Sequence, residues 1–272
     1  MSVQSDGSGK RWIQVEIEVP GTPEEVWKAI ATGPGMECWF MPLGTNADET
    51  EQKVGGAIYM GSGDEKQKVG EYTEWDPPRR FVAEGQSWGP DAPALAHEWT
   101  VETKAGGTCI VRVVNSYFAD SSDWDNQLGD MDLGWARFFR ILQRYMTDFS
   151  GQPCAAIHLM GPTGMPQSNV WETMTGAFGL DGAKEGAPWK SAIAGASELS
   201  GTVHQVEAGA APSAILRVDG SVSGTASPLA FTIGGQTMFA VGIYLYGDGA
   251  ADFVAREEPK WQSWMQETFF GG

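Results

Sequence analysis

The sequence predicts an α+β fold that is built twice, as two tandem domains that each wrap a curved antiparallel sheet around a long C-terminal helix. Three observations predict this fold. A segment near the start recurs at domain length, short strands separated by turns fill the middle of each half, and an amphipathic helix closes each half. Consecutive short strands joined by tight turns are typical of an antiparallel meander, and the apolar face of a helix is the economical cover for such a sheet.

The recurrence is offset by 144 residues, the separation of Ile13 from Ile157. Residues 13–36 read IQVEIEVPGTPEEVWKAIATGPGM and residues 157–180 read IHLMGPTGMPQSNVWETMTGAFGL. A repeat of this length indicates duplication of a whole domain and not a short solenoid repeat. We expect a flexible leader over residues 1–10, a first domain over 11–150 and a degenerate second copy over 151–272.

The first half opens with a strand in which Ile13, Val15, Ile17 and Val19 alternate with polar residues. Thr22 then caps a short helix, with Pro at the first helical position and Glu three residues after the cap, the pattern of a capping box. Further strands are expected at about 55–60, 68–75, 80–86, 96–104 and 108–117. A long amphipathic helix is expected at about 130–149.

The second half repeats this order more faintly. A strand is expected at 154–159 and a helix at 167–178. Four more strands are expected at about 200–207, 213–219, 225–233 and 236–246. The closing helix is expected at 250–269, with Pro259 interrupting or kinking it.

Composition excludes several classes of function. The net charge of −17 repels phosphate backbones and anionic lipids, so we expect neither nucleic-acid nor membrane binding. The 3 Cys and 3 His show no metal-ligand spacing, so no metal or other cofactor is expected. No secretory signal and no apolar run long enough to span a membrane is present, which predicts a soluble, cytoplasmic protein.

Several segments of the first half resemble a known family. These segments are IEVPGTPEEVWKAI (17–30), CWFMP (38–42), VGEYTEWDPPRRFVAE (69–84), HEWTVETKAGGTCIVRVVNSYF (97–118) and GWARFFRILQRYM (134–146). They resemble the START-like, or SRPBCC, helix-grip superfamily, and within it the branch of activator-of-chaperone-ATPase homologues. The resemblance implies a helix-grip fold with an apolar cavity between sheet and helix. Members of the superfamily include binders of hydrophobic molecules, cyclases or aromatases, hydrolases and a chaperone-binding branch, so the fold does not fix the function.

Aromatic residues are the main candidates for lining such a cavity, because 12 Trp in one chain is a high number. A filled core is the alternative interpretation of the same residues. The candidate set is Trp39, Phe40, Trp75, Trp99, Trp135, Phe138 and Phe139.

Three polar residues complete the candidate site. His97 alternates with Trp99 and could act as a general base or orient a polar group of a ligand. Arg112 alternates with Ile110 and Val114, so we expect it to project towards apolar surroundings, where it could anchor an acidic ligand. Glu16 could be a cavity acid or base if its strand face points inward, and a solvated charge if that face points to water.

The function we expect is binding of a small hydrophobic or aromatic molecule in the first domain, because the sequence contains no recognisable catalytic motif. One alternative is a polyketide cyclase/aromatase- or hydrolase-type enzyme that uses His97 or Glu16. A second alternative is a chaperone-associated module that binds a protein partner. The sequence names neither the ligand nor the oligomeric state.

Overall fold

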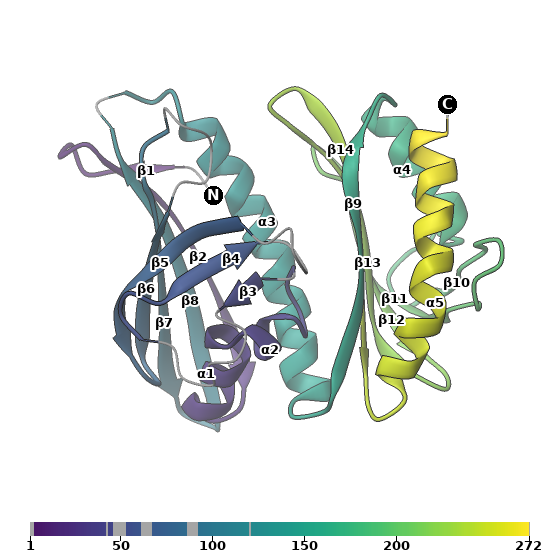
Figure 1. The fold of residues 1–272 in the computed structure, drawn as a ribbon, viewed down its shortest axis with the longest axis horizontal. Helices are drawn as coiled ribbons and strands as arrows, with labels where there is room; N and C mark the ends of the chain where they lie inside the picture. Colours follow the sequence, from purple (N-terminus) through teal and green to yellow (C-terminus); the bar gives the residue numbers. More distant parts are fainter. Residues whose placement is uncertain are drawn as a thin grey trace. The chain divides into compact units, whose positions relative to one another are not determined.

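The computed structural model describes residues 3–41, 43–45, 53–60, 67–85, 92–119 and 121–271. Pro42, the last residue of the CWFMP segment, lies outside the described residues. The chain divides into two compact units, Met1–Ser150 and Gly151–Gly272, here called the N-terminal and C-terminal domains. Each domain has an antiparallel sheet with a long helix packed on one side of it (Figure 1).

The sheet of the N-terminal domain is strongly curled and has the strand order β1-β2-β8-β7-β6-β5-β4-β3. Its strands are β1 (Gln4–Ser5), β2 (Lys10–Pro20), β3 (Leu43–Thr45), β4 (Ala57–Met60), β5 (Gln67–Asp76), β6 (Arg80–Gly85), β7 (Leu95–Lys104) and β8 (Thr108–Phe118). Within the expected leader, Gln4 and Ser5 form β1, which pairs with β2 through Gln4 opposite Trp12.

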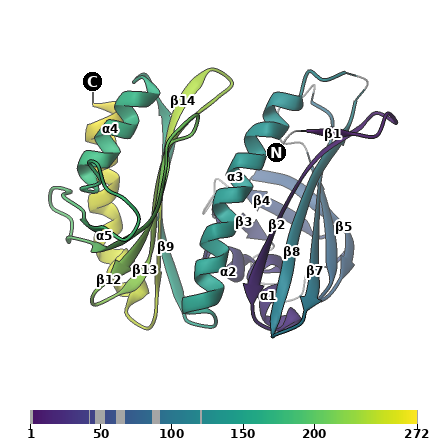
Figure 2. The same ribbon diagram turned by 180° about the vertical axis from the view of Figure 1, so that it is seen from behind.

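The helices of the N-terminal domain are α1 (Pro23–Ala31), α2 (Gly33–Met36) and α3 (Asp125–Arg144), and α3 continues into a π-helical turn, η2 (Tyr145–Phe149). The predicted capping box at the start of α1 is confirmed. Thr22 Oγ1 accepts from the Glu25 N–H at 3.3 Å, and the Glu25 carboxylate accepts from the Thr22 N–H at 2.8 Å. Helix α3 lies along the concave side of the sheet, as the two opposite views show (Figures 1 and 2).

The C-terminal domain repeats this topology with six strands, in the order β10-β11-β12-β13-β14-β9. Its first strand, β9, pairs with its last, β14, just as β2 pairs with β8. The elements are β9 (Cys154–Thr163), α4 (Gln167–Ala177), β10 (Pro188–Lys190), β11 (Ser200–Glu207), β12 (Ser213–Asp219), β13 (Ser223–Ile233), β14 (Gln236–Tyr246), α5 (Ala250–Met265) and η3 (Gln266–Phe270). The shared order strand, helix, meander, long helix and π-turn supports the duplication.

The core of the C-terminal domain fills the space between its sheet and its helices. Phe178, Trp189 and Trp261 are each at most 3% exposed and belong to one continuous cluster of buried side chains. Helix α5 continues through Pro259, so the residue does not end the helix as the sequence suggested it could. In the described residues, no helix is both long and apolar enough to cross a membrane.

Candidate functional site

The seven predicted aromatic residues form one network on the concave side of the N-terminal sheet. Trp99 is its centre: its ring lies 5.1 Å from that of Trp135, edge to face, and 5.8 Å from that of Phe81, stacked. Phe40 stacks on Trp135 with ring centroids 5.0 Å apart, which joins α2 and its following turn to α3. The connected rings are those of Trp27, Trp39, Phe40, Tyr72, Trp75, Phe81, Trp99, Trp135, Phe138 and Phe139.

Much of this network is packed core. Trp39 is 0% exposed, and its indole N–H donates to the Ala29 carbonyl at 2.9 Å, so its polar atom is already satisfied. Trp99 and Phe139 are also buried. Trp75 and Phe138 keep part of their surface accessible. The two partly exposed rings therefore mark the border of the network, where a bound molecule could reach it.

A row of side chains crosses the concave face beside this network, one on each of five adjacent strands. Tyr72 on β5 lies opposite Ala83 on β6, which lies opposite His97 on β7. His97 in turn lies opposite Asn115 on β8, and Asn115 opposite Ile13 on β2. We call these five residues the polar row. The neighbouring row contains Phe81 and Trp99, so polar groups and aromatic rings are adjacent on one face.

A bulge in β5 brings the two aromatic residues of that strand onto this face. Tyr72 and Trp75 are three residues apart, a spacing that places side chains on opposite faces of a regular strand. The register between β5 and β6 shifts between Tyr72 and Glu74. The extra residue turns both rings inward, and their centroids lie 4.9 Å apart.

His97 lines the interior as an unprotonated imidazole. Part of its surface is accessible although protein surrounds it, the combination typical of a residue in a concave wall. Desolvation lowers the pKa of His97 to about 4, and the nearby Asn115 side chain offsets part of this effect. His97 is therefore neutral at physiological pH and offers one donor and one acceptor nitrogen.

Asn115 is the functional candidate that sequence reasoning missed. The residue is 0% exposed, and neither the oxygen nor the nitrogen of its side-chain amide makes a hydrogen bond. The amide is close enough to influence His97, but no contact between them has hydrogen-bond geometry. An unmet buried polar group costs about 1–3 kcal/mol. Such a group in a native fold calls for an explanation such as a ligand or an ordered water.

Glu16 and Arg112 do not line the candidate site, because both lie on the opposite, outer face of the sheet. This corrects the expectation that Arg112 projects towards apolar surroundings. Arg112 Nε lies 3.0 Å from the Glu16 carboxylate, and its Nη1 lies 2.7 Å from that of Glu102. The Glu16 side chain is 50% exposed. Arg112 therefore points outward from β8, where two surface carboxylates neutralise its charge. Neither Glu16 nor Arg112 lines the interior.

A second polar cluster lies one row further along the concave face, and its groups satisfy one another. Arg11 Nε donates to the Asp125 carboxylate at 2.5 Å, and the Tyr117 hydroxyl donates to the same carboxylate at 2.7 Å. Desolvation and the bond to Asp125 raise the pKa of Tyr117 to about 12. This closed cluster fastens the start of α3 to β2 and β8 and leaves no cation available for a ligand.

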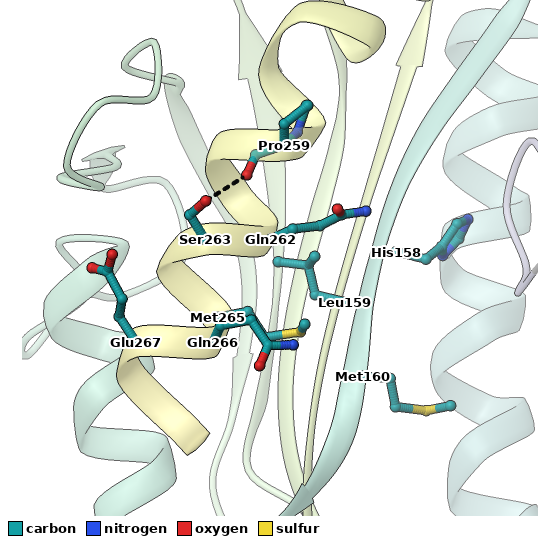
Figure 3. Close-up of a pocket in the computed structure, with 9 residues that line it drawn as sticks. All are labelled: His158, Leu159, Met160, Pro259, Gln262, Ser263, Met265, Gln266 and Glu267. Carbon is teal, nitrogen blue, oxygen red and sulfur yellow. Dashed lines mark hydrogen bonds between the residues drawn. The ribbon is translucent and has the colours of Figure 1, made fainter. Parts of the chain in front are cut away.

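The C-terminal domain has a surface pocket of about 520 Å³ between β9 and α5 (Figure 3). The strand contributes Leu159 and its two neighbours, and the helix contributes Pro259 and residues of its last turns. The Ser263 hydroxyl donates to the Pro259 carbonyl at 3.0 Å, a hydrogen bond that Figure 3 draws as a dashed line. The lining residues are His158, Leu159, Met160, Pro259, Gln262, Ser263, Met265, Gln266 and Glu267.

In the part of the chain that the structure describes, no three His, Cys, Asp or Glu side chains lie close enough together to hold a metal ion.

Residues 20–147 match the family model described as Activator of Hsp90 ATPase homolog 1-like protein. The match covers most of the N-terminal domain. The match runs from the end of β2 into η2 and so contains the polar row on β5 to β8 and the aromatic network. The family has the START-like helix-grip fold, and the C-terminal domain repeats that fold in reduced form.

Solved structures resemble the chain at low sequence identity. The di-domain ARO/CYC BexL from the BE-7585A biosynthetic pathway is 12% identical, with 94% of this chain and 93% of BexL covered and a TM-score of 0.44. DynU16, from the dynemicin biosynthetic locus, is 18% identical, with 94% and 96% covered and a TM-score of 0.40. The Aha1 dimer from Colwellia psychrerythraea is 18% identical, with 52% of this chain and 98% of that one covered and a TM-score of 0.41. No curated protein matches the chain.

Proposed function

We propose that the N-terminal domain binds a small, largely aromatic molecule between the concave face of its sheet and α3. The observation that carries the proposal is the fully buried, unpaired amide of Asn115, beside a neutral imidazole and next to an aromatic network. The rings at the border of the network would bury the apolar part of the molecule, and the polar row would fix its polar end.

Apolar burial supplies most of the affinity in this proposal. A bicyclic ring system that buries about 200 Å² gains about 5 kcal/mol before the costs of ordering are subtracted. Hydrogen bonds to buried groups that otherwise lack partners add selectivity, because only a matching ligand satisfies them.

The properties of His97 favour binding over catalysis. A general base works best when its pKa lies near the working pH. Desolvation holds the pKa of His97 at about 4, so the imidazole is a weak base. Glu16, the other catalytic candidate, lies on the outer face. These two observations support binding over the cyclase, aromatase and hydrolase alternatives, which depend on His97 or Glu16.

The test is a titration of the full chain with a panel of bicyclic and tricyclic aromatic compounds, followed by Trp fluorescence and thermal denaturation. We expect at least one compound to change the fluorescence and to raise the melting temperature of the N-terminal domain. In the variant Ala83→Phe, a ring would fill the row between Tyr72 and His97 and abolish both effects. Ala208→Phe, an exposed turn position in the other domain, is the matched control and should leave them intact. An unchanged melting temperature across the whole panel would refute the proposal.

A further inference from the structure

The unused hydrogen-bonding groups of the polar row describe the polar end of the ligand. The Asn115 amide carries one acceptor and two donors close together, and neither its oxygen nor its nitrogen makes a hydrogen bond among the described residues. Tyr72 lies on the same row, is 3% exposed and brings a hydroxyl group to this face. A ligand group that both donates and accepts a hydrogen bond would pair with the oxygen and the nitrogen of the Asn115 amide together. Two planar amides pair with each other in this way.

The charges around the polar row further restrict which polar group the ligand can carry. Arg112 lies on the outer face, and Arg11 is held by Asp125, so neither cation is available to the polar row. Arg137, on α3, lies over the Phe138 ring and has interactions of its own. The imidazole of His97 is unprotonated. A carboxylate placed against this row would be a buried charge without a counter-charge, which is costly.

We propose that the ligand carries an uncharged group with an adjacent hydrogen-bond donor and acceptor, such as a carboxamide or lactam attached to an aromatic system, and that the Asn115 amide selects it. This inference rests on the proposed function and deepens it by naming the ligand class. An ordered water on Asn115 is the competing occupant, and it would give no selectivity among ligands.

The experiment compares three probes of equal ring size: 2-naphthamide, 2-naphthoate and 2-methylnaphthalene. Their dissociation constants for the full chain are measured by Trp fluorescence titration at pH 7.5. We expect 2-naphthamide to bind at least about ten-fold more tightly than either of the other two probes.

The deciding variant is Asn115→Leu, which replaces the amide by an apolar group of similar size. Removing an unpaired buried polar group should not destabilise the fold, so we expect a melting temperature equal to or above that of the wild type. The variant should lose the preference for 2-naphthamide and bind 2-methylnaphthalene at least as well as the wild type does. Asn169→Leu, the same change at an exposed position of α4, is the control and should keep the wild-type preference.

The outcomes separate this inference from the function on which it rests. If the three probes bind the wild type equally, or if 2-naphthoate binds most tightly, the inference is wrong and the proposed function stands. If Asn115→Leu folds and keeps the preference for 2-naphthamide, Asn115 does not select the ligand and the inference again fails. If none of the probes binds, the proposed function fails together with the inference.

Discussion

Asn115 lies at a position where an apolar side chain would serve stability better. Its neighbours on the same face of β8, Val111 and Val113, are 0% exposed. Asn115 continues this row of inward-facing residues, but its side-chain amide makes no hydrogen bond among the described residues. Natural proteins tolerate such local costs chiefly at functional sites. The position is visible in the sequence as a polar residue within an apolar alternation, but its burial and its lack of a partner depend on strands far apart in the chain.

His97 has a measurable effect on the stability of its domain. Its pKa is lowered from 6.5 to about 4 in the folded state, so between these values the unfolded chain binds a proton that the folded domain does not. The stability that depends on His97 is therefore complete above about pH 6.5 and is lost as the pH falls towards 4.

When the pH is lowered from 7.5 to 4.5, we expect the free energy of unfolding of the N-terminal domain to fall by about 2 kcal/mol more in the wild type than in His97→Gln. The measurement is urea denaturation of both proteins at the two pH values, following the N-terminal transition. His204→Gln, in the other domain, should behave as the wild type does in that transition. Identical pH dependence of wild type and His97→Gln would show that the imidazole is not desolvated.

Glu257 on α5 is a buried carboxylate with a structural role. It is 0% exposed, accepts from the Ser197 N–H at 2.7 Å, and lies 3.0 Å from the Lys260 ammonium and 2.9 Å from the Arg256 guanidinium. Burial alone would raise its pKa, but the hydrogen bonds from Ser197, Lys260 and Arg256 outweigh burial and lower the pKa to about 2. The carboxylate thus fastens the segment before β11 to α5, and this contribution is present above about pH 4.5 and is lost as the pH falls towards 2.

Replacing Glu257 by Ala should lower the stability of the C-terminal domain by about 3 kcal/mol, because several donors lose a charged partner. Chemical denaturation at pH 7 measures the change. Glu172→Ala, an exposed carboxylate on α4, should change stability by less than about 0.5 kcal/mol. A loss at Glu257 no larger than that at Glu172 would contradict this role.

At the scale of elements, most strands and helices could be predicted from local patterns. The predicted strands 200–207, 213–219 and 236–246 coincide with β11, β12 and β14, because clear alternation and turn residues bound them. The bulge in β5 could not be predicted, since it depends on pairing with β6. The orientation of β8 was ambiguous, because both of its faces carry Val or Ile. That ambiguity is why Arg112 was expected to face inward.

Helices α5 and α1 each contain a proline, Pro259 and Pro23, at different positions along the helix. Pro23 occupies the first turn, where no hydrogen bond is lost, whereas Pro259 lies inside the helix and removes the bond to the preceding turn. We expect Pro259→Ala to stabilise the C-terminal domain by about 1 kcal/mol and Pro23→Ala to give no gain in the N-terminal domain. Thermal denaturation of both variants measures this difference. A loss of stability in Pro259→Ala would mean that its ring packing in the pocket outweighs the missing bond.

At the scale of the whole molecule, duplication explains the architecture and divergence explains the difference between the domains. The recurrence at an offset of 144 residues predicted the repeat, and the pairing of β2 with β8 has its counterpart in the pairing of β9 with β14. The sequence also indicated that the second copy is reduced. It could not show that buried rings fill the second core, or that the polar row forms in the first, because both depend on contacts between distant strands.

Hydrogen–deuterium exchange of the full chain, with and without 2-naphthamide, tests the central claim most directly, because it locates the ligand in one domain or the other. The account predicts slower exchange in peptides that cover β7, β8 and the first half of α3, and unchanged exchange in peptides that cover β9 and α5. Protection confined to β9 and α5 would place the ligand in the surface pocket of the C-terminal domain. Either that result or the absence of protection in β7 and β8 would contradict the account.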